Sequence, residues 1–284
     1  MYFSNATFKI LFAVSCLASW FHASQAIAVI YEVTFDATWS AATHPSAYPS
    51  GAHFSPLIGT THNDQVTFWE PGGIATAGIE QMAETGGTGT LTSEIVAAGS
   101  GAESLITTGG LNSPGSISTT FNISPSHPFV TLVTMIAPSP DWFVGIHDYD
   151  FRVGNAWLPQ VTIDLFPYDA GTDSGVDFTS PNNDTNPQDP IALLGAPFTG
   201  TPAMGTFQFT LLGDFDLNGN IDGADFLKWH RGESPIPYSQ ADLDDWKINF
   251  GGATPAFAAA VVPEPVTWHM MLFGISLVLT SRRK

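Results

Sequence analysis

The chain has 284 residues, and its 26 acidic against 8 basic side chains give a formal net charge of −18 at pH 7. Hydrophobic residues make up 44% and charged residues 12%, which is the composition of a chain with a buried core and not of a disordered one. Between Val29 and Leu212 the only basic residue is Arg152. Nucleic-acid binding needs a basic surface that neutralises phosphates, so that class is excluded. The acidity suits divalent cations or basic partners instead.

The first 26 residues have the order of a secretory signal peptide. Lys9 precedes an apolar stretch over 10–21, and small residues follow at 24–26. The stretch is short for a membrane anchor, so export is predicted. The single cysteine, Cys16, lies in this leader. The exported chain therefore has no disulfide, and its core, helped by bound metal, must hold the fold.

Residues 29–205 predict a mainly β domain. Short segments alternate between apolar and polar residues, and clusters of Gly, Pro, Ser, Thr and Asn separate them. Many short strands at this spacing indicate an antiparallel sandwich or barrel. One helix is expected over 74–84, ended by Gly86. The predicted strands are 31–35, 65–69, 116–121, 129–136, 161–165 and 206–211.

Three sequence motifs in this region point to a known family. They are His53-Phe54-Ser55-Pro56-Leu57-Ile58-Gly59, Ser139-Pro140-Asp141-Trp142-Phe143-Val144-Gly145 and Asp169-Ala170-Gly171-Thr172-Asp173. Residues 30–195 resemble the spondin N-terminal domain. The resemblance implies a C2-like antiparallel β-sandwich from an extracellular matrix or adhesion protein, with calcium at one end. Animal members carry cysteines between the last two motifs, and this chain has none there.

The resemblance places the calcium carboxylates at Asp141, Asp169 and Asp173. The residue chemistry agrees, because Ca²⁺ takes about six to eight oxygen ligands. Gly171 lets the loop curl so that both neighbouring aspartates aim inward, and a divalent ion removes the repulsion between them.

Other interpretations stay open for this region. The same carboxylates can be solvated loop acids, and Asp164 or Asp177 can add a further ligand. His44, His53 and His62 recur nine residues apart, which raises the alternative of zinc or copper. No short ligand motif has this spacing, so hydrogen-bonding roles are favoured for the histidines.

Residues 213–251 predict a small helical unit with an EF-type calcium loop. Oxygen-bearing residues stand at positions 1, 3, 5, 7, 9 and 12 of a twelve-residue stretch, and Gly219 stands at position 6, where the turn is sharp. Ile221 is expected to point into the core. Aspartate at position 12, with a helix only after the loop, resembles a type I dockerin. The predicted ligands are Asp214, Asp216, Asn218, Asn220 through its backbone carbonyl, Asp222 and Asp225.

The helix after this loop has a second copy. The pattern at 224–229 recurs at 241–246, 17 residues later, with Ser239 as the expected cap and Gly251 as the expected end. Position 1 of the second loop is Arg231, so that loop is expected to bind no calcium. The resemblance to dockerins implies a cohesin-like receptor. A calcium-stiffened spacer is the equal alternative.

The C-terminal region reads as a linker, 252–262, followed by a sorting tail, 263–284. Val262-Pro263-Glu264-Pro265 precedes an apolar run at 266–279, and Arg282-Arg283-Lys284 ends the chain. This order resembles the PEP-CTERM sorting signal, and the resemblance implies recognition by an exosortase-type enzyme. The apolar run predicts a transient transmembrane helix, and a plain membrane anchor is the alternative. Either one places the body outside the cytoplasm.

The sequence thus predicts an exported, calcium-binding, non-catalytic adhesion or matrix module at the cell surface or in the extracellular space. It has no Ser-His-Asp order, zinc-protease motif or phosphate loop. A secreted hydrolase acting on polysaccharide is one alternative, because paired aspartates can supply an acid and a base. A cohesin-type assembly subunit is the other. Matrix components or polysaccharides are the expected partners.

Overall fold

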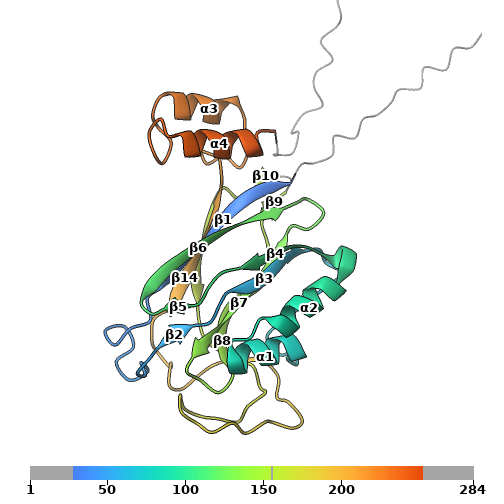
Figure 1. Cartoon of the computed structure of the whole chain (residues 1–284), viewed down its shortest axis with the longest axis vertical. Coiled ribbons are helices and arrows are strands. Elements are labelled where there is room, and N and C mark those ends of the chain that lie inside the picture. The colour runs from blue at the N-terminus through green and yellow to red at the C-terminus, as the bar shows by residue number, and fades with distance from the viewer. Residues whose placement is uncertain (1–27, 155, 252–284) are drawn as a thin grey trace, which may run out of the picture.

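The protein was analysed as a computed structural model, which describes residues 28–154 and 156–251. Two antiparallel sheets pack face to face, so the prediction of a mainly β sandwich is confirmed (Figure 1). The first sheet has four strands in the order β11-β14-β1-β6. Its strands are β1 (Val29–Ala37), β6 (Gly115–Ile123), β11 (Gln160–Leu165) and β14 (Gly205–Leu211).

The second sheet has eight strands and is built around β7 and β8. Its path runs β13-β12-β8-β7-β2-β5, while β3 pairs with both β7 and β4. The strands are β2 (His53–Phe54), β3 (Ile58–His62), β4 (Ala102–Thr107), β5 (Leu111–Asn112), β7 (Phe129–Ala137), β8 (Trp142–Asp150), β12 (Tyr168–Asp169) and β13 (Ala192–Leu193). A separate short ribbon pairs β9 (Arg152–Val153) with β10 (Ala156–Trp157).

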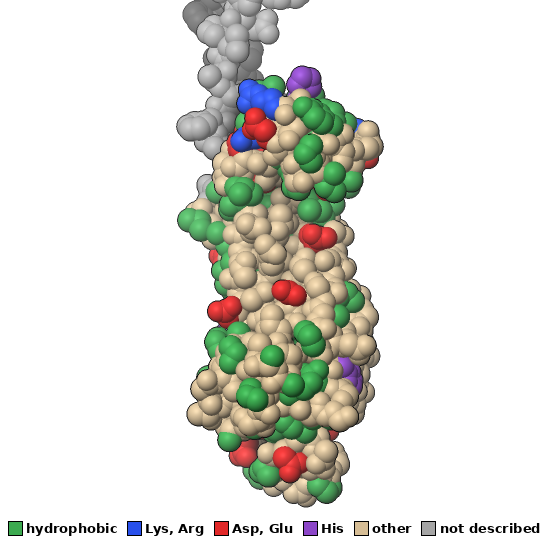
Figure 2. All heavy atoms as spheres, turned by 90° about the vertical axis from the view of Figure 1, so that its left-hand side faces the viewer, with side chains coloured by type: hydrophobic (Ala, Val, Ile, Leu, Met, Phe, Trp, Pro, Cys, Tyr) green, Lys and Arg blue, Asp and Glu red, His purple; other side chains and the backbone are tan. Residues whose placement is uncertain are grey.

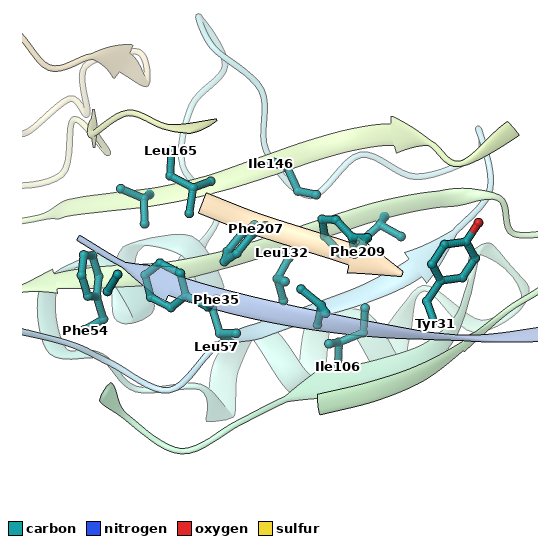
Figure 3. Packing of buried hydrophobic residues seen from close by; sticks show 14 of the residues in the cluster. Tyr31, Phe35, Phe54, Leu57, Ile106, Leu132, Ile146, Leu165, Phe207 and Phe209 are labelled. Atoms are coloured by element: carbon teal, nitrogen blue, oxygen red, sulfur yellow. The ribbon is translucent and has the colours of Figure 1, made fainter. Parts of the chain in front are cut away.

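The main core fills the space between the two sheets. Alternation along β1 sends Tyr31 and Phe35 inward, where they meet the inward residues Phe207 and Phe209 of β14 and Leu132 of β7 (Figure 3). The aromatic rings pack edge to face, as ring quadrupoles favour, for example at 5.3 Å between the centroids of Phe35 and Phe207. Full burial of each such side chain contributes roughly 1.5–3 kcal/mol.

A second core lies between the eight-stranded sheet and a helical layer (Figure 1). That layer is made of α1 (Ala77–Thr85), α2 (Gly89–Ala97) and the 3₁₀ turn η1 (Gly99–Gly101). The helix predicted over 74–84 begins at Ala77, because the Thr76 side chain accepts a hydrogen bond from the Ile79 amide and caps the helix there. It ends at Gly86, in the left-handed conformation, as predicted.

Two sequence-based expectations in this domain were wrong. Residues 65–69 form no strand: the Asn63 side chain accepts a hydrogen bond from the Gln65 amide in a turn, and Phe68 and Trp69 are buried in the second core. The expectation of a single helix missed α2. The other five predicted strands are present, within β1, β6, β7, β11 and β14.

Residues 213–251, called here the two-helix unit, contain α3 (Gly223–His230) and α4 (Gln240–Asn249) at one end of the sandwich (Figure 1). On the face shown in Figure 2, basic side chains gather on this end, while the sandwich below carries separate acidic ones. Across residues 28–154 and 156–251, no helix combines the length and apolar character that crossing a membrane requires. The predicted leader (1–26), linker (252–262), sorting tail (263–284) and its transmembrane run lie outside the described residues.

Candidate metal centres

Three carboxylates of the EF-type loop come together. Asp214, Asp216 and Asp225 each place one oxygen within 4.8 Å of the others. In the part of the chain that the structure describes, they are the only group of three or more acidic, histidine or cysteine ligands at such spacing. Asp214 and Asp225 are buried, and Asp216 is partly exposed. The fold therefore brings together the side chains at positions 1, 3 and 12 of the loop.

Backbone amides hold the loop in this shape. The two oxygens of Asp214 accept hydrogen bonds from the amides of Asn218 and Gly219, at 3.1 and 2.7 Å. One oxygen of Asp225 accepts from the Asp216 amide at 3.1 Å. Gly219 has φ +80°, a conformation that favours glycine. Asp214 and Asp225, the first and last residues of the loop, thus hold its backbone in place through these hydrogen bonds.

Two other predicted ligands are engaged locally. The side chain of Asp222 accepts a hydrogen bond from the Ala224 amide at 2.7 Å and caps α3. The side-chain oxygen of Asn218 accepts from the Asn220 amide at 2.8 Å. Asp222 is not a member of the close group of acidic side chains, and Asn218 and Asn220 would contribute amide and carbonyl oxygens instead. Their assignment as ligands stays a prediction.

The loop is electrostatically suited to a cation. Burial, followed by the nearby charges of Asp225 and Asp216, raises the pKa of Asp214 to about 6. Burial is also the main cause that raises the pKa of Asp225. No lysine or arginine among the described residues pairs with these carboxylates. A hard divalent cation would supply the missing positive charge, and the oxygen-only donor set fits Ca²⁺.

The two-helix unit is attached to the sandwich by buried contacts. Ile221 is 1% exposed and belongs to the main core, as predicted. A Cβ at Gly219 would collide with the carbonyl oxygen of Trp157 in β10. The Asn249 side chain accepts a hydrogen bond from the Ile30 amide at 2.9 Å and donates one to the Leu212 carbonyl at 2.7 Å.

The second copy of the loop is organised without its first acidic position. Arg231 stands at the C-cap of α3, and Asp242 accepts a hydrogen bond from the Ile236 amide at 2.8 Å. Ser239 caps α4 by accepting from the Asp242 amide at 3.0 Å, as the sequence predicted.

The loops that carry the candidate carboxylates Asp141, Asp169 and Asp173 lie at the end of the sandwich opposite the two-helix unit. Asp141 is fully buried, and its Oδ2 accepts hydrogen bonds from the amides of Thr172 and Asp173, at 2.8 and 3.1 Å. Its Oδ1 is buried and has no hydrogen-bond partner among the described residues. Asp169 lies on β12 and accepts from the Gly171 amide at 2.8 Å. A buried carboxylate oxygen without a donor is an unusual feature, and a bound cation would satisfy it.

Asp141, Asp169 and Asp173 do not form a group as close as the one in the EF-type loop. They are nevertheless electrostatic neighbours. Burial and then the charge of Asp169 raise the pKa of Asp141 to about 6. Burial likewise raises the pKa of Asp169. The backbone amides of Gly175 and Asn183 bind both oxygens of Asp173, at 2.6 and 2.8 Å.

Glu84 is a candidate that sequence reasoning missed. It lies near the end of α1, and its Oε1 is buried without a hydrogen-bond partner in the described part of the protein. Burial raises its pKa, a hydrogen bond with Thr172 opposes that shift, and the charges of nearby acids including Asp173 add to it. Glu84 therefore faces the same loop as Asp141. Nothing in its local sequence distinguishes it from a solvent-exposed helical glutamate.

The remaining candidates lie apart from one another. Each predicted histidine has its own hydrogen-bond partner, as the favoured hydrogen-bonding roles require. The pairs are His44 Nε2 with Pro202 O at 3.1 Å, His53 Nδ1 with Gly51 O at 2.8 Å, and His62 Nε2 with Thr131 Oγ1 at 2.9 Å. Asp164 is on β11, and Asp177 accepts from the Thr179 amide in an exposed loop.

Two antiparallel sheets with helices on one outer face and buried acids in the loops at one end define a β-sandwich domain, here with an appended two-helix unit. Residues 29–208 match the Spondin_N family, and the chain belongs to that family. The two-helix unit follows the matched segment.

Curated relatives match the same region. Spondin-2 of Rattus norvegicus is 37% identical over 182 residues, which cover 61% of this chain and 54% of that protein. Spondin-2 of Homo sapiens is 36% identical over the same length. Spondin-1 of Bos taurus is 37% identical over 173 residues, or 58% of this chain and 21% of that protein. The chain thus spans about half the length of Spondin-2 and about a fifth of Spondin-1.

Proposed function

We propose that this chain is an exported, non-catalytic, calcium-binding module of the adhesion or matrix type. The observation that carries the proposal is the close group of Asp214, Asp216 and Asp225, two of them buried and none paired with a basic side chain in the described residues. Membership of the Spondin_N family supports an extracellular setting. The acidic surface supports cations or basic partners.

Calcium would bind at two places under this proposal. The side chains of Asp214, Asp216, Asn218, Asp222 and Asp225, with the backbone carbonyl of Asn220, would hold one ion. Asp141, Asp169, Asp173 and Glu84 would hold the other. Both ions would act structurally, because each neutralises carboxylates that burial disfavours in their ionised form.

Calorimetry of the purified, processed protein tests this directly. We expect two bound ions per chain, one lost on Asp214→Ala and the other on Asp141→Ala. Asp36→Ala, which removes an exposed carboxylate of β1 that belongs to neither group, is the matched control. Chelation should lower the melting temperature, since an ion at a hundredfold excess over its Kd adds about 2.7 kcal/mol of stability. A chain that binds no calcium at millimolar concentration would refute the proposal.

The hydrolase alternative has a separate test. Release of sugar from extracellular polysaccharides by the wild type, abolished by Asp141→Ala, would replace the non-catalytic assignment. We expect no turnover, because the side chains of Asp141 and Asp173 already accept backbone hydrogen bonds.

An assembly role for the two-helix unit is the second candidate. Leu227 of α3 is 48% exposed and Ile248 of α4 is 63% exposed, so both helices present apolar side chains. Pull-down of a cohesin-like domain by the wild type, reduced by Leu227→Ala, would support it. For the sorting tail, mass spectrometry of the envelope-bound protein should find a C-terminus near Pro263, as processing by an exosortase-type enzyme requires.

A further inference from the structure

A cleft separates the sandwich from the two-helix unit. Its volume is about 570 Å³, and both modules line it. On the sandwich side the lining includes Glu32 of β1. On the side of the two-helix unit it includes Leu217 of the EF-type loop and Ile236 of the second loop. Helix α4 contributes Asp242 and Asp245. Neither module has this cleft by itself.

Four carboxylates line the cleft without a positive partner among the described residues: Asp214, which belongs to the EF-type loop, and Glu32, Asp242 and Asp245. Glu32 and Asp245 make no side-chain hydrogen bond or ion pair within residues 28–154 and 156–251. Asp242 is only 6% exposed, and its Oδ2 accepts from the Ile236 amide, while its Oδ1 has no hydrogen-bond partner in the same residues. Burial, then Asp242 and Glu32, raise the pKa of Asp245. Glu233, also in the lining, differs because Lys228 pairs with it at 2.9 Å.

The spacing of these acids selects an organic cation over a metal ion. They do not form a group within the 4.8 Å that brings Asp214, Asp216 and Asp225 together. A guanidinium is larger, and its donors point in several directions within one plane. The cleft also has apolar walls, with Leu217 54% and Ile236 60% exposed. Such walls fit the aliphatic stem of a long cationic side chain and an apolar neighbour.

We propose that this cleft binds an arginine side chain of a partner polypeptide, with the guanidinium among Glu32, Asp242 and Asp245 and an adjacent apolar residue against Leu217 and Ile236. Charge complementarity supports this occupant, since an uncompensated acidic cleft gains most from a basic ligand. The site joins the sandwich to the two-helix unit, so binding would also favour their docked arrangement.

The test uses the exported protein in saturating calcium and a capped tripeptide of arginine between two leucines. Its partner peptide replaces arginine by citrulline, which keeps the shape and removes the charge. We expect measurable binding of the arginine peptide alone, weakened by raising sodium chloride. Glu32→Gln should weaken it about tenfold, the loss expected for one charge-assisted contact. Asp245→Asn should act in the same direction.

Asp36→Asn is the matched control. It removes one negative charge from the same strand and the same outward face as Glu32, away from the cleft. Unchanged affinity in this variant separates a specific site from general attraction to an acidic protein. Equal binding of the citrulline peptide, or equal losses for Glu32→Gln and Asp36→Asn, would overturn the proposal. A large gain in affinity when residues 282–284 are removed from the unprocessed chain would assign the cleft to the chain's own basic end instead.

Discussion

Replacing Asn249 with alanine should loosen the two-helix unit from the sandwich. The Asn249 side chain is 1% exposed, accepts from the Ile30 amide at 2.9 Å and donates to the Leu212 carbonyl at 2.7 Å. Alanine leaves a part-buried donor, the Ile30 amide, and a part-buried acceptor, the Leu212 carbonyl, without these partners. Such a loss costs about 1–3 kcal/mol for a fully buried group. Because both groups here are part-buried, the two losses together should lower the free energy of unfolding by roughly 2–4 kcal/mol.

Urea unfolding in saturating calcium measures the change, and hydrogen exchange locates it. The Ile30 amide should exchange faster in Asn249→Ala, since its acceptor is gone. Ile248→Ala is the matched control, because the neighbouring side chain is 63% exposed and its removal should change stability by less than about 0.5 kcal/mol. If both variants unfold at the same urea concentration and protection of Ile30 is unchanged, the side-chain contacts of Asn249 do not hold the two modules together.

Three further predictions concern the candidate metal centres. Because burial raises the pKa of Asp214 from 3.8 to about 6, ionisation of this carboxyl disfavours the metal-free fold. Compared with Asp214→Asn, the metal-free wild type should lose up to roughly 3 kcal/mol of unfolding free energy as the pH rises from 4 to 6. Calorimetry should also show that calcium affinity falls below pH 6, because protons compete for the carboxylate. Gly219→Ala should lower the melting temperature, since its φ is +80° and its Cβ meets the Trp157 carbonyl, whereas Gly223→Ala, with open space around it, should not. Glu84→Gln should weaken calcium binding at the sandwich end and leave the loop site unchanged, as separate calorimetric steps would reveal.

Periodicity predicted the strands whose two faces differ in exposure. In β1, Tyr31 and Phe35 face the core while Glu32 and Asp36 face outward, and the sequence alternates accordingly. The same alternation at 65–69 predicted a strand that is not there, because Phe68 and Trp69 belong to a loop and are buried in the second core. Alternation records burial, and a loop can bury side chains as a strand does.

Tertiary contacts explain why α2 escaped prediction. Its sequence begins with glycine and contains threonine, serine and β-branched residues, which favour helices weakly. Leu91 and Ile95 are buried in the second core. The Glu94 side chain binds the Gly78 amide at 2.7 Å and the Thr76 hydroxyl at 2.7 Å at the start of α1. The helix is thus stabilised by a neighbour that the local sequence does not reveal.

The two candidate metal centres differ in how local they are. Positions 1, 3 and 12 of the EF-type loop lie within twelve residues, so their spacing alone predicted that Asp214, Asp216 and Asp225 would meet. At the other end, Glu84 lies on α1, Asp141 directly precedes β8 and Asp169 lies on β12, so these acids are far apart in the sequence. Asp141 and Asp169 were identified as ligands through the family resemblance. Glu84 could be recognised only in the folded structure, where its Oε1 is buried without a hydrogen-bond partner among the described residues. The cleft beside Glu32 was equally invisible, since it needs α4 placed against β1.

The contact between Ile30 and Asn249 also fixes how the domain would be displayed. It holds the first strand's start beside the last helix's end, so the polypeptide enters and leaves the sandwich at one pole. The nine residues of β1 extend about 30 Å from there toward the pole that bears the Asp141 loops. A tether attached just before β1 or just after α4 would therefore leave the pole with the Asp141 loops about 30 Å from the point of attachment, free to contact a partner.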